Sequence, residues 1–201
     1  MNLIEKTALK CILTMSIALA LMVAIMAIPD KAHAEDGYLT IDVNKATHTL
    51  TLRQGENIIS QYDVITGKPG TPTPSFTTSF NTITINPTWN PAAKSQAHFR
   101  KHPELRSHYA LKRDKNGRFY SLPGEKNPMG KARFELLYSK PIRIHGTSEP
   151  ELFQTDRRNY SSGCVRVLEI QQLVTDILGD QVKWDKSYSI KLPYKINVIV
   201  H

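Results

Sequence analysis

One cysteine and one histidine carry the most informative chemistry of this sequence. Cys164 follows the Ser-Ser-Gly run at 161–163, and His145 stands before Gly146, with fifteen residues between His145 and Ser161. A thiol becomes a strong nucleophile when a nearby imidazole removes its proton, so this pair can perform acyl transfer through a thioester. We therefore expect Cys164 to be the nucleophile and His145 to be its general base.

The residues beside Cys164 suggest how such a centre would be completed. Gly163 permits a tight turn, and we expect the amide N–H groups of Gly163 and Cys164 to face a developing oxyanion. Arg166 offers a planar fork for a carboxylate, or else forms a structural ion pair. The residue types alone also leave open that Cys164 is an inert buried thiol, because lone buried cysteines are common.

The elements that must position these residues are mostly strands. Alternating apolar and polar residues predict strands at 38–43, 47–52, 57–65, 76–85, 134–138, 142–144, 181–184, 187–192 and 195–200. Apolar residues recur at helical spacing from Ile170 to Leu178 and stop before Gly179, which predicts one clear helix. The fold class is therefore mainly β and sandwich-like, with His145 at a strand end and Cys164 just before the helix.

Residues 92–127 differ from the rest in composition and read as a partly helical insertion, a candidate lid over the site. The run 114–117 (Asp-Lys-Asn-Gly) predicts a turn. His98 and His102 have the spacing of a helical zinc pair, but Pro103 follows at once and no third ligand is evident. We therefore expect surface histidines, with no metal and no organic cofactor.

The N-terminal segment and the number of cysteines indicate in which compartment of the cell the domain works. Residues 1–34 have a basic start, an apolar run at 11–28 and an Ala-His-Ala end, which predicts a signal peptide, or an anchor if the segment is kept. The remaining domain, 35–201, would then face the periplasm or the outer side of the inner membrane. Its one thiol, Cys164, has no partner for an intramolecular disulfide in an oxidising compartment.

The net charge of +8 at pH 7 would favour a polyanionic partner. Export argues against nucleic acid and leaves anionic wall or membrane-surface polymers. A basic surface that only maintains solubility is equally compatible with this charge.

The motifs resemble the L,D-transpeptidase catalytic domain, or YkuD, family, whose signature is a His, a similar spacer and a Gly-Cys turn followed by Arg or Asn. Residues 67–74, 86–89, 123–130 and 152–158 extend the likeness, which is strongest to its YcbB-like branch and covers about residues 38–200. Ser162 departs from the commoner form, which has His there, but fits that branch. The large accessory domains usual in that branch are absent from 35–201.

The resemblance implies roles for further residues. The Gly146 carbonyl would orient His145, and Arg166 would shape the site or hold a substrate carboxylate. Ser162 and Gly163 would lie in the substrate-binding turn. Trp89 and Tyr160 would line the peptide groove, although tryptophan is more often a core residue.

The same resemblance implies an enzyme of peptidoglycan biosynthesis, cell-wall organisation and cell shape that acts on stem peptides. A second stem or a wall-anchored lipoprotein would supply the acceptor amine. With water as acceptor the enzyme would be an L,D-carboxypeptidase, and carbapenems could acylate Cys164. A non-catalytic peptidoglycan-binding module is the alternative of another class. A sortase places its histidine far upstream, and a papain-like endopeptidase has Cys before His, so both fit less well.

Overall fold

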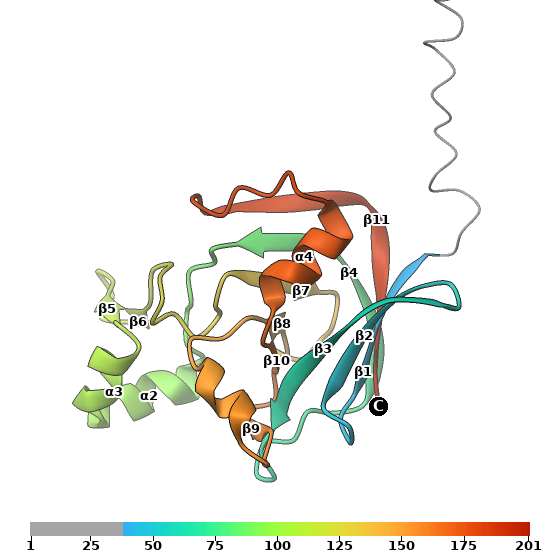
Figure 1. The fold of residues 1–201 in the computed structure, drawn as a ribbon. Helices are drawn as coiled ribbons and strands as arrows, with labels where there is room; N and C mark the ends of the chain where they lie inside the picture. The colour runs from blue at the N-terminus through green and yellow to red at the C-terminus, as the bar shows by residue number, and fades with distance from the viewer. Residues whose placement is uncertain (1–37) are drawn as a thin grey trace, which may run out of the picture. The chain divides into compact units, whose positions relative to one another are not determined.

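Strands make up most of the secondary structure of residues 38–201, the part of the chain that this computed structural model describes (Figure 1). The strands are β1 (Leu39–Asn44), β2 (Thr49–Gln54), β3 (Asn57–Gly67), β4 (Phe76–Ile85), β5 (Lys112–Arg113), β6 (Phe119–Tyr120), β7 (Ala132–Leu136), β8 (Ile144–His145), β9 (Asn159–Ser161), β10 (Val165–Val167) and β11 (Tyr188–Val200). The helices are α2 (Ala93–Lys101), α3 (Pro103–His108), α4 (Ile170–Leu178) and the 3-10 helix η2 (Pro150–Gln154). The predicted mainly β fold is confirmed.

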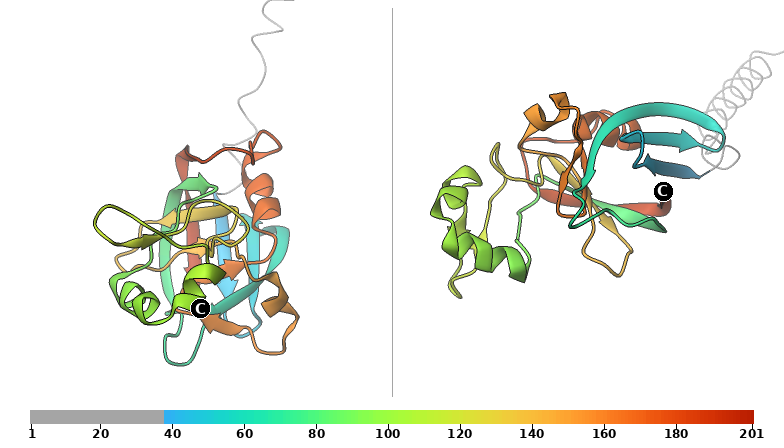
Figure 2. Two further views of the ribbon diagram at one scale, coloured as in Figure 1. Left: turned by 90° about the vertical axis from the view of Figure 1, so that its left-hand side faces the viewer. Right: turned by 90° about the horizontal axis from the view of Figure 1, so that it is seen from below.

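The principal sheet has nine strands within the described residues, in the order β10-β8-β7-β4-β11-β1-β2-β3-β9. Strand β10 also pairs with β3, antiparallel, through Arg166 opposite Ile65 and Val167 opposite Val64. This second pairing connects β10, at one end of the sheet, with β3, which lies next to the other end, and closes the sheet into a barrel, which Figure 2 shows from two further directions. The closing strand β10 begins directly after Cys164, so the thiol lies where the barrel closes.

The barrel interior is filled by one apolar cluster to which the strands contribute from both halves of the chain. Phe80 of β4 stacks on Phe134 of β7 with ring centroids 4.7 Å apart, and both rings are fully buried. Helix α4 adds Ile170, Leu173 and other apolar residues of one face, as its spacing predicted. Burial of this surface supplies the main driving force for holding the strands together.

Helix α4 ends as predicted at Gly179. The glycine has φ +77°, a conformation that costs little only without a side chain, and its N–H donates to the Thr175 carbonyl at 2.7 Å. The long apolar face and this terminator are both local features. That is why the helix bounds could be predicted closely.

The predicted strand at 181–184 is wrong. Instead of pairing with a strand, this segment leads into a loop that the Asn86 side chain holds, because its Nδ2 donates to the carbonyls of Trp184 and Lys186 at 2.7 and 2.9 Å. The two last predicted strands form one strand, β11, whose register against β4 shifts between Lys191 and Ile196. Pro193 lies within that irregularity and produced the apparent break.

The insertion contains α2, α3 and the β5–β6 hairpin, which lie together on one side of the barrel (Figures 1 and 2). The predicted turn at 114–117 closes the hairpin, with the Gly117 N–H donating to the Asp114 carbonyl. Buried Gln96 of α2 bonds both backbone groups of Phe119 at 2.7 Å. The Gln96 contacts fasten α2 to the hairpin.

The predicted signal peptide or anchor at 1–34 lies outside the described residues. Among residues 38–201, every helix is too short or too polar to span a bilayer.

Candidate active site

The pairing of β8 with β10 brings the candidate catalytic residues to one corner of the barrel. The two strands run parallel, with Val165 opposite Ile144 and Arg166 opposite His145. The Val165 N–H also donates to the Arg143 carbonyl at 2.9 Å, which places Cys164 beside the start of β8. Two motifs that are separated in the sequence are thus joined by backbone hydrogen bonds.

His145 is 3 % exposed, and its orientation is set by the next residue. Its Nδ1 lies 2.6 Å from the Gly146 carbonyl oxygen. A carbonyl only accepts hydrogen bonds, so Nδ1 carries the proton and Nε2 keeps its lone pair, as a general base requires. Burial, followed by the Arg166 charge, lowers the pKa of His145 to about 3, so the imidazole is neutral at pH 7.

Gly146 is closely packed, which explains the absence of a side chain at this position. A Cβ there would lie 2.7 Å from Cγ2 of Ile170 and 3.2 Å from the Cα of Gly130. Its N–H donates to the Ala132 carbonyl of β7 at 3.0 Å. The group that orients His145 is therefore held by β7 on one side and α4 on the other.

Cys164 is presented by a tight loop in which Ser161 makes two bonds. The Ser161 Oγ donates to the Cys164 carbonyl at 2.5 Å and accepts from the Gly163 N–H at 3.0 Å. Gly163 has φ +113°, a backbone conformation that a side chain would strain. The Gly163 amide is thus used within the loop, which differs from the expectation that it faces an oxyanion.

The loop at 67–74, which begins where β3 ends, holds the cysteine loop through hydrogen bonds. Buried Thr73 accepts a hydrogen bond from the Gly67 N–H and donates one to the Gly163 carbonyl, both at 2.9 Å. The Lys68 N–H donates to the Ser161 carbonyl at 3.0 Å. The family resemblance in the sequence includes this loop, but the hydrogen bond from Thr73 to Gly163 is apparent only in the folded structure.

The Cys164 thiol is partly buried, and its hydrogen-bond partner is the Pro141 carbonyl at 4.0 Å. Burial raises the pKa of Cys164, although a backbone contact with Arg143 and the charges of Arg143 and Arg166 act in the opposite direction. Both members of the candidate pair are therefore neutral at pH 7. The arrangement suits proton transfer during attack better than a permanent thiolate–imidazolium pair.

Arg166 forms a salt bridge with Glu149, Nη1 to Oε2, at 2.6 Å. The ion pair, one of the two roles left open from the sequence, is thus present, and the role of Arg166 in binding substrate stays a prediction. Sequence reasoning missed Glu149, since an acidic residue in a loop belongs to no pattern. Only its place four residues after His145 hinted at a role.

The other predicted site residues lie in different settings. Trp89 is edge-on to Phe99 and Tyr109, with centroids 5.7 Å from each, so it belongs to an aromatic cluster that joins the insertion to the barrel. Tyr160 is 39 % exposed on β9 and accepts a bond from Thr155 Oγ1 at 3.3 Å. Ser162 is exposed within the cysteine loop. Their roles in substrate binding stay predictions.

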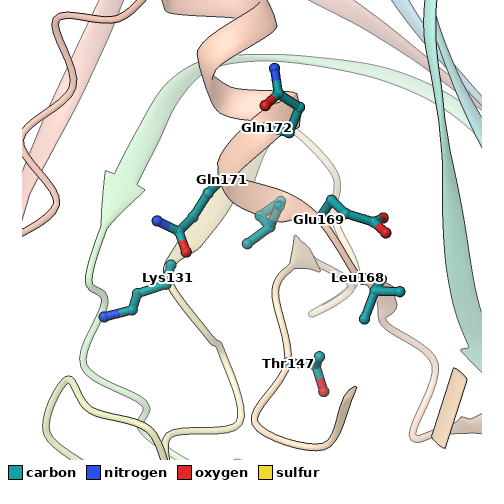
Figure 3. Close-up of a pocket in the computed structure, with 7 residues that line it drawn as sticks. Lys131, Thr147, Leu168, Glu169, Gln171 and Gln172 are labelled. Carbon is teal, nitrogen blue, oxygen red and sulfur yellow. The ribbon is translucent and has the colours of Figure 1, made fainter. Parts of the chain in front are cut away.

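A pocket of about 460 Å³ lies behind the histidine segment, at the first turn of α4 (Figure 3). Thr147, which follows Gly146, and Lys131, which precedes β7, contribute to its wall, and residues 168–172 supply the rest. Neither Cys164 nor His145 lines it. The pocket is therefore separate from the face on which the thiol lies.

His98 and His102 have ring centroids 4.2 Å apart, and Nδ1 of His102 pairs with Glu104 at 2.9 Å. Within residues 38–201 no group of three or more His, Cys, Asp or Glu side chains is arranged to hold a metal ion.

The sequence model of the L,D-transpeptidase catalytic domain, YkuD, matches residues 39–183. The chain belongs to this family. The match spans the histidine segment, the cysteine loop and α4, and thus includes the whole corner described above. A comparison with curated proteins found no match.

Solved structures similar to this chain include several L,D-transpeptidases. One from Mycobacterium smegmatis is 14 % identical and aligns over 82 % of this chain and 58 % of its own, with a TM-score of 0.47. L,D-transpeptidase 3 from Mycobacterium tuberculosis is 11 % identical over 82 % and 61 %, with a TM-score of 0.48. The catalytic domain from E. faecium L,D-transpeptidase is 12 % identical over 79 % and 99 %, with a TM-score of 0.42. The chain thus spans under two thirds of the two mycobacterial proteins.

Proposed function

We propose that this YkuD-family chain is an L,D-transpeptidase that acts on peptidoglycan stem peptides through a thioester on Cys164. The observation that carries the proposal is the β8–β10 pairing, which joins a neutral, oriented His145 to the loop that presents the thiol. Neutral imidazole accepts a proton, and the Gly146 carbonyl leaves Nε2 as the atom that does so.

In the proposed reaction, His145 Nε2 removes the thiol proton as Sγ attacks the carbonyl carbon of the third stem residue, typically meso-diaminopimelate. The C–N bond to the terminal D-alanine breaks, and the imidazolium returns its proton to the leaving amine. An acceptor amine then attacks the thioester and restores the thiol. Arg166, Gly163 and Ser162 would contact the donor peptide, with Trp89 and Tyr160 along the groove.

The same proposal places residues 35–201 in the periplasm or on the outer face of the inner membrane, after a signal peptide or anchor at 1–34. Assignment to the YcbB-like branch is likewise a proposal, supported by the Ser-Ser-Gly-Cys run at 161–164. No metal or organic cofactor takes part in the proposed steps.

Incubation with tetrapeptide-bearing muropeptides, followed by mass analysis, tests the proposal. We expect loss of D-alanine and a new dimer with the wild-type protein, and neither product with Cys164→Ala. Loss of D-alanine without a dimer would favour the L,D-carboxypeptidase reading. Binding without any product, with folded protein, would contradict the enzyme and favour the peptidoglycan-binding module.

A further inference from the structure

Glu149 lies between the insertion and the catalytic corner, and both of its carboxylate oxygens are engaged. Oε2 accepts from Arg166 Nη1 at 2.6 Å. Oε1 accepts from the Nε2–H of His108 at 3.2 Å and from the Tyr109 hydroxyl at 3.3 Å. One side chain therefore connects the end of α3 with the arginine of the cysteine motif.

The backbone of Glu149 is also held from the histidine segment. Its N–H donates to Oγ1 of Thr147 at 2.9 Å, and Thr147 follows Gly146 directly. This turn directs the Glu149 side chain back toward β10 immediately after β8 has ended. The position of the carboxylate thus depends on the same segment that positions His145.

The salt bridge is shielded from solvent, since both side chains are only 15 % exposed. A pair in this setting interacts more strongly than a surface pair, and removal of one partner leaves the other poorly compensated. The Arg166 charge lowers the pKa of both Cys164 and His145. The charge of Arg143 adds to this effect at Cys164, and that of Arg133 adds to it at His145. Any change in how well Glu149 neutralises Arg166 should therefore change the pKa values of both Cys164 and His145.

We infer that Glu149 is a positioning residue for acyl transfer, which holds and neutralises the Arg166 guanidinium beside Cys164 and His145 and anchors the end of α3 to it. The inference rests on the proposed function of Cys164 and His145. The Glu149 carboxylate thus attaches the insertion to the site, because it bonds the end of α3 on one side and Arg166 of the cysteine motif on the other.

The test is Glu149→Gln, which keeps the shape and one acceptor oxygen but removes the charge. With Arg166 no longer neutralised, the Cys164 thiolate is stabilised and His145 becomes a weaker base. We expect the pH midpoint of Cys164 alkylation by iodoacetamide to fall by about half a unit. With the muropeptide substrate, kcat should fall about tenfold while KM changes less than about twofold.

Three variants separate the inference from a merely structural role. Glu149→Asp keeps the charge and should restore the alkylation midpoint and part of kcat. Tyr109→Phe removes only a contact to α3 and should leave the midpoint unchanged. Glu151→Gln, an exposed acid two residues further on, should change neither quantity.

The outcomes are distinguishable from failure of the proposed function. An alkylation midpoint in Glu149→Gln that is unchanged or raised, in protein whose thermal unfolding shows it to be folded, overturns the inference. Alkylation needs no turnover, so it reports on Glu149 even if Cys164→Ala shows that the muropeptide reaction belongs elsewhere. Should Glu149→Gln not fold, Arg166→Gln decides: loss of the guanidinium beside a charged Glu149 should raise the alkylation midpoint, and a midpoint equal to that of wild type overturns the inference.

Discussion

At the scale of single residues, burial determines the protonation of the proposed catalytic pair. His145 is enclosed by the barrel corner and keeps a neutral ring, with its Nδ1 proton directed to the Gly146 carbonyl. Cys164 is less enclosed, but burial still disfavours its thiolate. In the proposed reaction, attack on the substrate would therefore couple bond formation to proton transfer, because neither partner is charged beforehand.

The first prediction concerns the pH dependence of Cys164 alkylation in the wild-type protein. The thiolate reacts, and a raised pKa means that it forms only above the usual cysteine range of about 8.5. We expect one rise in rate on the alkaline side, measured by mass analysis of the Cys164 peptide. A reactive plateau between about pH 5 and 7, typical of a cysteine–histidine ion pair, would contradict the neutral pair.

The second prediction concerns His145 and acid stability. Its pKa in the fold is about 3, below the unfolded value of 6.5, so between these values the unfolded chain binds the extra proton. Stability is therefore lost as the pH falls through this window, at up to about 1.4 kcal/mol per pH unit from this residue. Urea unfolding at several pH values should show a shallower acid loss in His145→Gln. Equal slopes in both proteins would refute the assignment.

At the scale of elements, the cysteine loop depends on a neighbouring loop for its shape. Thr73 bridges Gly67 and Gly163, which are far apart in the sequence. The strand β3 that ends at Gly67 pairs with β10, so the two loops leave the same region of the barrel. The geometry around Cys164 is thus produced by contacts between elements as well as by its own residues.

The third prediction is that Thr73→Val lowers both stability and turnover. Valine fills the same space but leaves a buried N–H and a buried carbonyl without their partner, at a combined cost of about 2–4 kcal/mol. Urea unfolding measures the loss, and the muropeptide reaction measures turnover. Thr71→Val, which removes one longer bond to the Ser161 carbonyl at 3.3 Å, is the matched control and should cost less than about 1 kcal/mol. Equal losses in the two variants would exclude the special role of Thr73.

At the scale of the whole molecule, one apolar cluster connects the closed sheet with α4. Strand β10, which follows Cys164, pairs with β8 on one side and β3 on the other and so closes the barrel. The barrel and the corner that holds His145 and Cys164 should therefore unfold together, because both depend on this one apolar cluster.

The fourth prediction is that Leu173→Ala weakens the molecule without dividing its unfolding into steps. Leu173 is fully buried, and truncation to alanine should cost about 2–5 kcal/mol. Followed by circular dichroism in urea, the midpoint should fall while the slope stays that of wild type. Gln171→Ala, at an exposed position of the same helix, should change stability by less than about 0.5 kcal/mol. A second transition or a shallower slope would show that the corner unfolds separately.

The sequence by itself determined the local features: the β4 strand, the α4 helix with its Gly179 end, and the cysteine and histidine motifs. Each is encoded by residues close together in the chain, as periodicity, a terminator or a motif. The three-residue strands β9 and β10 are too short to show such a period, and they escaped prediction.

Only the tertiary structure decided the closure of the sheet by β10, the neutral state of His145 and the Glu149–Arg166 pair. These features depend on which distant segments become neighbours and on how far water is excluded from them. A sequence pattern shows neither. The residue types at Cys164 and His145 therefore pointed to the chemistry, whereas the fold determined their protonation and the carboxylate that holds Arg166.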